Sequence, residues 1–174
     1  MTDKTPKKPL IEGFDLPQGG RNIHANCLVL KSDDQTFGLL VSGDAGAGKT
    51  QLCFSLFERW NNVQTRSAKW VSDDRTVLEL KPNGLNASPP EGLAGIAELR
   101  GLGPVGVKHC ASIVLTHWVH LVPAEQIERV QPREQLAIAS FDDAPLHFLK
   151  APSGQAEWAA RMIDYWLSGD LHQV

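Results

Sequence analysis

A glycine-rich segment has the residue types and the spacing of a phosphate-binding loop. Residues 43–50, GDAGAGKT, match the pattern G-x-x-x-x-G-K-[ST]. In this pattern the glycines allow a tight turn, successive backbone N–H groups point into one concave site, and the following helix adds its positive N-terminal end. Lys49 can then reach the β- and γ-phosphates, and the Thr50 hydroxyl can hold Mg²⁺. The segment therefore predicts a site for a nucleoside triphosphate with Mg²⁺. Its predicted nucleotide-binding residues are Gly43, Asp44, Ala45, Gly46, Ala47, Gly48, Lys49 and Thr50.

An acidic pair, Asp73-Asp74, follows a short apolar segment. Adjacent side chains of an extended chain point to opposite sides, so one carboxylate can face a metal while its neighbour faces a substrate. Phosphoryl transfer to a hydroxyl uses both kinds of group, a metal on the phosphate oxygens and a carboxylate that accepts the hydroxyl proton. A solvated turn that continues into Arg75 is the alternative interpretation.

A second charged segment contains Glu98 and Arg100 just before a glycine-rich stretch. Two positions apart, these side chains share a face if the chain is extended. A carboxylate for a metal beside a guanidinium for phosphate would suit a triphosphate site, whereas an ion pair before a turn is the better interpretation of the segment alone. The histidines are weaker signals. His24 lies among apolar neighbours, where a structural role is more common, and the spacing of His117 and His120 puts them on opposite faces of a strand, which argues against a shared metal.

Regular elements on both sides of the glycine-rich loop are expected to hold it. Residues 36–42 predict a strand that enters the loop, and residues 49–60 predict a helix that leaves it. Alternation over residues 22–31 predicts an earlier strand, which forms a hairpin with 36–42 through a turn at 32–35. The apolar face of the predicted helix consists of Leu52, Cys53, Leu56, Phe57 and Trp60.

The remainder of the chain predicts more strands than helices. A last helix is expected after a cap at Ser153 and ends at Gly169. A turn is expected at 82–84, a proline-containing loop at 86–92 and a short helix at 124–130. Further strands are expected at 68–72, 76–81, 93–99, 112–122 and 146–149. The predicted fold class is α/β, with a mixed, largely antiparallel sheet and few flanking helices.

Composition limits the classes of function. The chain has 174 residues, 42% of them hydrophobic and 21% charged, which favours one ordinary globular domain over residues 21–174 after a flexible segment at 1–20. The net charge of −3 and the absence of a long apolar run argue against nucleic acid and membranes as partners. The three cysteines, Cys27, Cys53 and Cys110, are odd in number and widely spaced, so we expect buried free thiols in a cytoplasmic protein.

The order of these motifs resembles the catalytic domain of HPr kinase/phosphorylase. His24, the loop at 43–50, the pair Asp73-Asp74 and the segment from Glu98 to Gly103 occur in the order of the family signatures, roughly GDSGxGKS, ADD and EIRGLG. The resemblance covers about residues 20 to 110. It implies a fold like that of phosphoenolpyruvate carboxykinase around the loop, in a short form that lacks the additional N-terminal domain. It also implies ATP-dependent phosphorylation of a serine on HPr, the phosphocarrier protein of the sugar phosphotransferase system.

The resemblance also implies residue roles. Lys49 corresponds to the lysine that contacts phosphate, and Asp74 to the aspartate that acts as base in phosphorylation and as acid in its reversal. His24 and Arg100 correspond to an active-site histidine and to the signature arginine, which completes the expected catalytic set. The expected Mg²⁺ ligands are Thr50, Asp73 and Glu98.

Other properties stay open at the level of sequence. Residues 141–151 contain no arginine where long members of the family carry one, so we expect reverse dephosphorylation to be weak. The same difference leaves an ATP-binding sensor without transfer activity as the alternative function. A small-molecule kinase ranks last, because the arginine-rich lid of such enzymes has no counterpart. A homo-oligomer stays open as well, since long members form hexamers.

Overall fold

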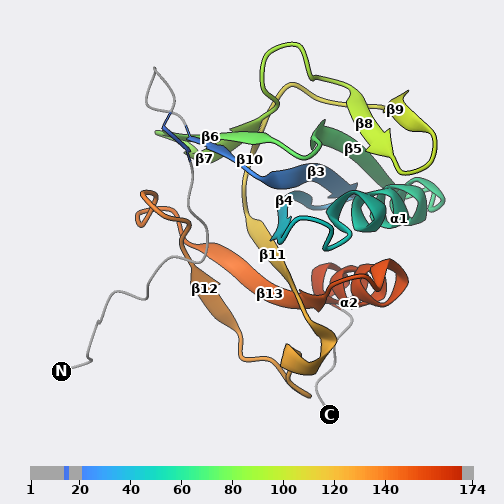
Figure 1. The fold of residues 1–174 in the computed structure, drawn as a ribbon. Coiled ribbons are helices and arrows are strands. Elements are labelled where there is room, and N and C mark those ends of the chain that lie inside the picture. The colour runs from blue at the N-terminus through green and yellow to red at the C-terminus, as the bar shows by residue number, and fades with distance from the viewer. Residues whose placement is uncertain (1–13, 16–20, 170–174) are drawn as a thin grey trace.

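Two β-sheets and two covering helices form layers in the computed structural model, which describes residues 14–15 and 21–169 (Figure 1). Most of the segment 1–20, expected to be flexible, lies outside the described residues, and so does the end of the chain after residue 169. A six-stranded sheet forms the middle layer in the order β12-β13-β11-β4-β3-β5. Its strands are β3 (Ala25–Ser32), β4 (Thr36–Gly43), β5 (Arg66–Ser72), β11 (His117–Val122), β12 (Glu134–Leu136) and β13 (Leu146–Pro152).

A five-stranded sheet packs on one face of the middle layer, in the order β1-β2-β6-β7-β10. All its pairs are antiparallel, whereas β11 lies parallel to both β4 and β13 in the larger sheet. The strands of the five-stranded sheet are β1 (Phe14–Asp15), β2 (Arg21–Ile23), β6 (Thr76–Lys81), β7 (Gly84–Ser88) and β10 (Ile113–Val114). The predicted mixed, largely antiparallel α/β fold is confirmed.

The helices α1 (Lys49–Asn61) and α2 (Ala156–Ser168) lie on the other face of the six-stranded sheet (Figure 1). The apolar face predicted for the first helix is correct, because Leu52, Cys53, Leu56 and Trp60 are buried in the core between helices and sheet. The last helix ends at Gly169 as predicted, but it begins at Ala156 rather than beside Ser153. Gln155 takes the N-cap position, and Ser153 lies in the turn before it, where its N–H donates to Val122 O.

Strands β3 and β4 are buried on both faces. Along β3, Leu28 and Leu30 face the helices, whereas Ala25 and Cys27 face the five-stranded sheet. Such doubly covered strands are apolar at nearly every position. Cys27 and Cys53 are buried free thiols, as predicted, and burial raises the pKa of both well above the ordinary value, while Cys110 is only half-buried.

Two predicted strands each turn out to be a pair of strands in different sheets. The strand predicted at 22–31 bends at His24, so that β2 joins the five-stranded sheet and β3 the six-stranded one. The strand predicted at 112–122 divides in the same way into β10 and β11. Leu115 N–H bonds to Leu85 O in one sheet, and Thr116 N–H bonds to Gly38 O in the other. Alternation did not reveal these corners, because it indicates which side chains share a face and not which sheet the strand joins.

The other expected elements are partly correct. The strands at 36–42, 68–72, 76–81 and 146–149, and the turn at 82–84, are present. The predicted loop 86–92 is wrong at its start, which belongs to β7, and the predicted helix at 124–130 is a single 3-10 turn, η1 (Ala124–Gln126). The strand predicted at 93–99 is shorter and forms a separate hairpin of β8 (Ile96–Leu99) and β9 (Gly103–Gly106). In the part of the chain that the structure covers, none of the helices is long and apolar enough to span a bilayer.

The sheet corner at Thr116 generates a stability prediction. A Cβ added at Gly38 would lie 2.1 Å from the carbonyl oxygen of Val114, so Gly38→Ala forces backbone to move. We expect the free energy of unfolding to fall by about 1–3 kcal/mol or more, the usual cost of overpacking a core. Urea denaturation measures it, with Gly106→Ala as control, because a Cβ there meets nothing within 4 Å. Equal stability of the two variants would contradict the tight crossing.

His117 generates a second prediction, on pH. Its ring stacks on His147 and packs edge-on against Phe37 and Trp166, and burial, followed by the charge of His147, lowers the pKa of His117 to about 4. In the unfolded chain its pKa is about 6.5, so the unfolded state gains the proton first on acidification. The free energy of unfolding should therefore decrease as pH falls from about 6.5 to about 4.

The measurement is urea denaturation of wild type and His117→Phe at pH 7 and pH 5. The variant keeps an aromatic ring but cannot titrate, so its stability should fall less between the two pH values. Identical losses in both proteins would show that His117 is not the group responsible.

Candidate functional site

The glycine-rich loop connects β4 to α1 with the geometry that its sequence predicts. Gly46 and Gly48 have φ of 79° and 91°, in the left-handed region, and Gly48 is the N-cap of α1. The loop is fixed by a bond from Ala47 N–H to Asp44 O and by one from Gly154 N–H to Ala47 O. No acidic residue lies in the first turn of α1, so no carboxylate of its own neutralises the positive end of the helix. This end of α1 can therefore take an anion.

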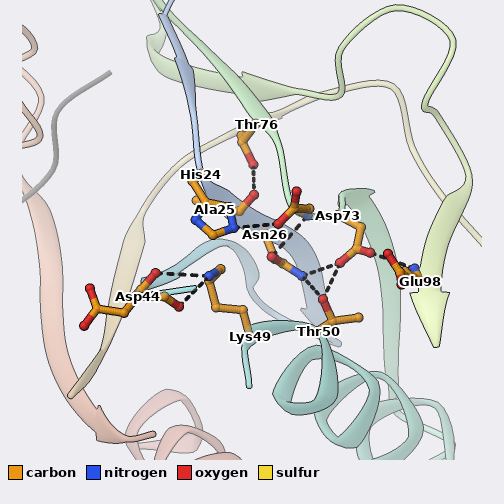
Figure 2. A network of polar contacts seen from close by, with 11 residues as sticks. His24, Ala25, Asn26, Asp44, Lys49, Thr50, Asp73, Thr76 and Glu98 are labelled. Carbon is orange, nitrogen blue, oxygen red and sulfur yellow. Dashed lines mark hydrogen bonds and ion pairs between the residues drawn. The ribbon is translucent and has the colours of Figure 1, made fainter. Parts of the chain in front are cut away.

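Lys49 is buried at the base of the loop. Its ammonium group donates to Gly43 O at 3.0 Å and to Asp44 O at 3.1 Å (Figure 2). Burial lowers the pKa of Lys49, while the carboxylates of Asp74 and Asp44 act in the opposite direction. The cation therefore faces both the loop and the acidic pair.

Thr50 and Asp73 join the loop to the acidic pair. Asp73 follows β5, and its Oδ1 accepts the Thr50 hydroxyl at 2.8 Å and the side-chain amide of Asn26 (Figure 2). Its Oδ2 accepts the backbone N–H of Glu98 at 2.7 Å, so Asp73 also holds the β8–β9 hairpin near its turn. The two motifs identified separately in the sequence thus form one hydrogen-bonded unit.

Asp74 faces the other way, toward His24. Its Oδ1 lies 2.6 Å from His24 Nε2, and its φ of 60° is in the left-handed region that few residues with side chains adopt. The Asp74 side chain is 64% exposed and that of His24 is 39% exposed. The two neighbouring carboxylates therefore point to different partners, and their roles as a metal-facing and a substrate-facing group stay predictions.

In the described part of the chain, the side chains of Glu98 and Arg100 form no hydrogen bond or ion pair with the acidic pair. The contact of Glu98 with Asp73 is made by its backbone, and Arg100 is exposed at the turn between β8 and β9. Within residues 21–169, no hydrogen bond or ion pair links Arg100 to Asp73 or Asp74. The roles of the Glu98 carboxylate and of the Arg100 guanidinium stay predictions.

Two polar residues beside the loop were missed by the sequence analysis. Asn26 is fully buried and bonds to both motifs, and its one sequence signal was a polar side chain in an apolar strand. His120 lies beside Ser42 in the register of β11 with β4, with its Nδ1 2.8 Å from the Ser42 hydroxyl. Burial lowers the pKa of His120, while Asp44 raises it. His117 lies three residues earlier, at the start of β11.

The residues present fit a magnesium ion. Between residues 21 and 169 there is no group of three histidine, cysteine, aspartate or glutamate side chains suited to a metal. Mg²⁺ does not need one, because it keeps several waters and is held by one or two carboxylates and substrate phosphates. The Thr50 hydroxyl donates its proton to Asp73 and its oxygen accepts one bond from Asn26, which leaves a lone pair free for a ligand. Thr50 and Asp73 are therefore the residues that would hold the ion.

Comparison with known proteins confirms the resemblance. No family model matches the chain. The chain is 33% identical over 75 residues to HPr kinase/phosphorylase of Xylella fastidiosa strain M12 and 32% identical over 74 residues to that of Xanthomonas campestris pv. campestris strain B100. Each match covers 42% of this chain, and only 22% and 21% of the relatives' own lengths. In structure the chain is similar to the HPr(Ser) kinase/phosphatase from Coxiella burnetii, with a TM-score of 0.64 and 21% identity over 86% of this chain and 98% of that one. The fold is therefore the one that the motifs imply.

Proposed function

We propose that this chain is an ATP-dependent protein-serine kinase that phosphorylates a phosphocarrier protein of the HPr type. The observation that carries the proposal is the hydrogen-bonded unit of Thr50, Asp73 and Asn26, because it joins a phosphate-binding loop to an acidic pair. The names of the similar proteins support the substrate class.

The loop supplies the nucleotide half of this function. Its backbone N–H groups and the N-terminal end of α1 would bind the phosphates of ATP, and the Lys49 ammonium would neutralise their charge. Bound at Thr50 and Asp73, Mg²⁺ would supply charge neutralisation on the β- and γ-phosphate oxygens.

Asp74 supplies the acceptor half. Its carboxylate would orient a serine hydroxyl and take its proton as the serine oxygen bonds to the γ-phosphorus. The bond from that phosphorus to the β,γ-bridging oxygen breaks, and ADP leaves. His24 is hydrogen-bonded to Asp74 and would hold the carboxylate in place, while Arg100 would reach the phosphoryl group from the hairpin turn. The exposure of Asp74 suits an acceptor carried on another protein rather than one enclosed in a pocket.

An ATP-binding regulator without transfer activity is the second candidate. It is favoured by the exposed position of Arg100 and by the lack of arginine in residues 141–151. The same lack leads us to propose that any reverse dephosphorylation is weak.

Lys49→Met tests the nucleotide half. Removing the buried cation should weaken ATP binding about 10- to 100-fold, as expected for the loss of a charged hydrogen-bonding group. Isothermal titration calorimetry measures the affinity. Lys69→Met, on the exposed side of β5, is the matched control and should bind like wild type. Unchanged affinity of Lys49→Met would place the triphosphate elsewhere.

Asp74→Asn tests the acceptor half. Asparagine tolerates the left-handed backbone at this position and is nearly isosteric, so the variant should fold and bind ATP normally. Transfer of labelled phosphate from ATP to purified HPr should fall about 10²- to 10⁴-fold, because the proton acceptor is lost. Asp33→Asn, in the exposed turn before β4, removes the same charge elsewhere and should transfer normally. Normal transfer by Asp74→Asn would exclude this base, and ATP binding without transfer in wild type would favour the regulator.

A further inference from the structure

We propose that Asn26 is a positioning residue that holds Thr50, Asp73 and Asp74 in one arrangement and thereby couples nucleotide binding to Mg²⁺. The inference rests on the proposed function and adds a residue to it. Asn26 is the second residue of β3 and is 0% exposed. A buried amide in an apolar strand needs partners for its donors and its acceptor, and those partners show what it does.

Both ends of the Asn26 amide are used on the candidate site. The NH₂ group donates to Thr50 Oγ1 at 3.1 Å and to Asp73 Oδ1. The carbonyl oxygen accepts the backbone N–H of Asp74 at 3.2 Å. One side chain therefore binds the loop, the predicted metal carboxylate and the predicted base.

The strand order explains why this position requires such a residue. β3 lies between β4, which leads into the loop, and β5, which leads into the acidic pair. The pairing of β3 with β5 ends at Cys27 and Ser72, so no strand ladder holds the two residues that follow Ser72. At that point the Asn26 side chain bonds to both residues, Asp73 and Asp74.

The carbonyl oxygen of the Asn26 amide fixes the backbone of Asp74 and thereby the direction of its carboxylate. The left-handed φ of Asp74 turns its peptide N–H toward Asn26 and its carboxylate toward His24. Without the Asn26 oxygen, this N–H loses its partner and the unusual backbone loses a restraint. The NH₂ group of Asn26 fixes the positions of the Thr50 hydroxyl and the Asp73 carboxylate, the groups that would hold Mg²⁺.

The test compares ATP affinity with and without Mg²⁺, by calorimetry on the whole chain, for wild type and Asn26→Ala. The Mg²⁺-free affinity should stay within about twofold, because the loop backbone and Lys49 are unchanged. The gain in affinity on adding Mg²⁺ should fall about 10- to 100-fold, the usual cost of losing a residue that orients metal ligands. Asn26→Leu removes the same bonds without leaving a cavity and should give the same result if Asn26→Ala is poorly folded.

A second readout needs neither metal nor activity. Amide hydrogen exchange at Asp74 in the metal-free protein should become at least about tenfold faster in either Asn26 variant, because the N–H loses its acceptor. The matched control is Asn61→Ala. Asn61 also makes three side-chain hydrogen bonds, to Phe57 O and to the N–H and O of Ala68, but at the far end of α1, about 16 Å from Thr50 along the helix. It should lower stability without changing either readout.

The outcomes separate this inference from the proposed function. Unchanged Asp74 exchange in the Asn26 variants overturns the inference, and so does an unchanged Mg²⁺ gain. An equal loss of affinity with and without Mg²⁺ also overturns it, since that would indicate general damage to the loop. If wild type binds no ATP, the proposed function fails, while Asp74 exchange still decides whether Asn26 holds the acidic pair.

Discussion

The candidate site depends on the hydrogen bond between the Thr50 hydroxyl and Asp73 Oδ1, 2.8 Å long. It joins two segments that the chain builds separately, the loop after β4 and the acidic pair after β5. Because β3 lies between these strands, one of its side chains can contact both segments where they meet. Asn26 is that side chain. A site made this way is held by strands buried on both faces, so its parts have little freedom to drift apart.

The double coverage of the central strands has a second consequence. The helices bury one face of β3 and β4, and the five-stranded sheet buries the other. Strands that pass between the sheets hold the layers together: the chain bends at His24 on the way from β2 to β3 and crosses at Leu115–Thr116 on the way from β10 to β11. His24, at the first of these corners, is also the partner of Asp74. The corner that joins the layers therefore also places a side chain in the site.

The sequence predicted the parts of the site that local chemistry determines. The glycines of the loop need left-handed backbone, Thr50 follows Lys49 on the first turn of α1, and the acidic pair follows a buried strand, so each could be found from a short segment. The mixed, largely antiparallel fold and the hairpin of β3 and β4 also followed from patterns within single segments. The Thr50 hydroxyl bonds to Asp73, while the role of both residues as Mg²⁺ ligands stays a prediction from the resemblance.

What could not be predicted depends on which strands are neighbours. Asn26 looked like one polar residue in an apolar strand, because its partners lie 24, 47 and 48 residues away. His120 lies beside the loop only because β11 pairs in parallel with β4. The two sheet corners were hidden for a related reason, since an apolar segment buried in one sheet has the same composition as one buried in the other. The start of the last helix shows the same limit, because its N-cap is Gln155 and not Ser153.

The central claim is that the loop and the acidic pair form one site for a nucleoside triphosphate and Mg²⁺. The most direct test is a crystal structure of the chain with a non-hydrolysable ATP analogue and Mg²⁺. The account predicts the β- and γ-phosphates within the loop at 43–50, the ion about 2.1 Å from the Thr50 oxygen and close to Asp73, and the Asp74 carboxylate facing the γ-phosphate. An empty loop, or an ion bound away from both Thr50 and Asp73, would contradict it.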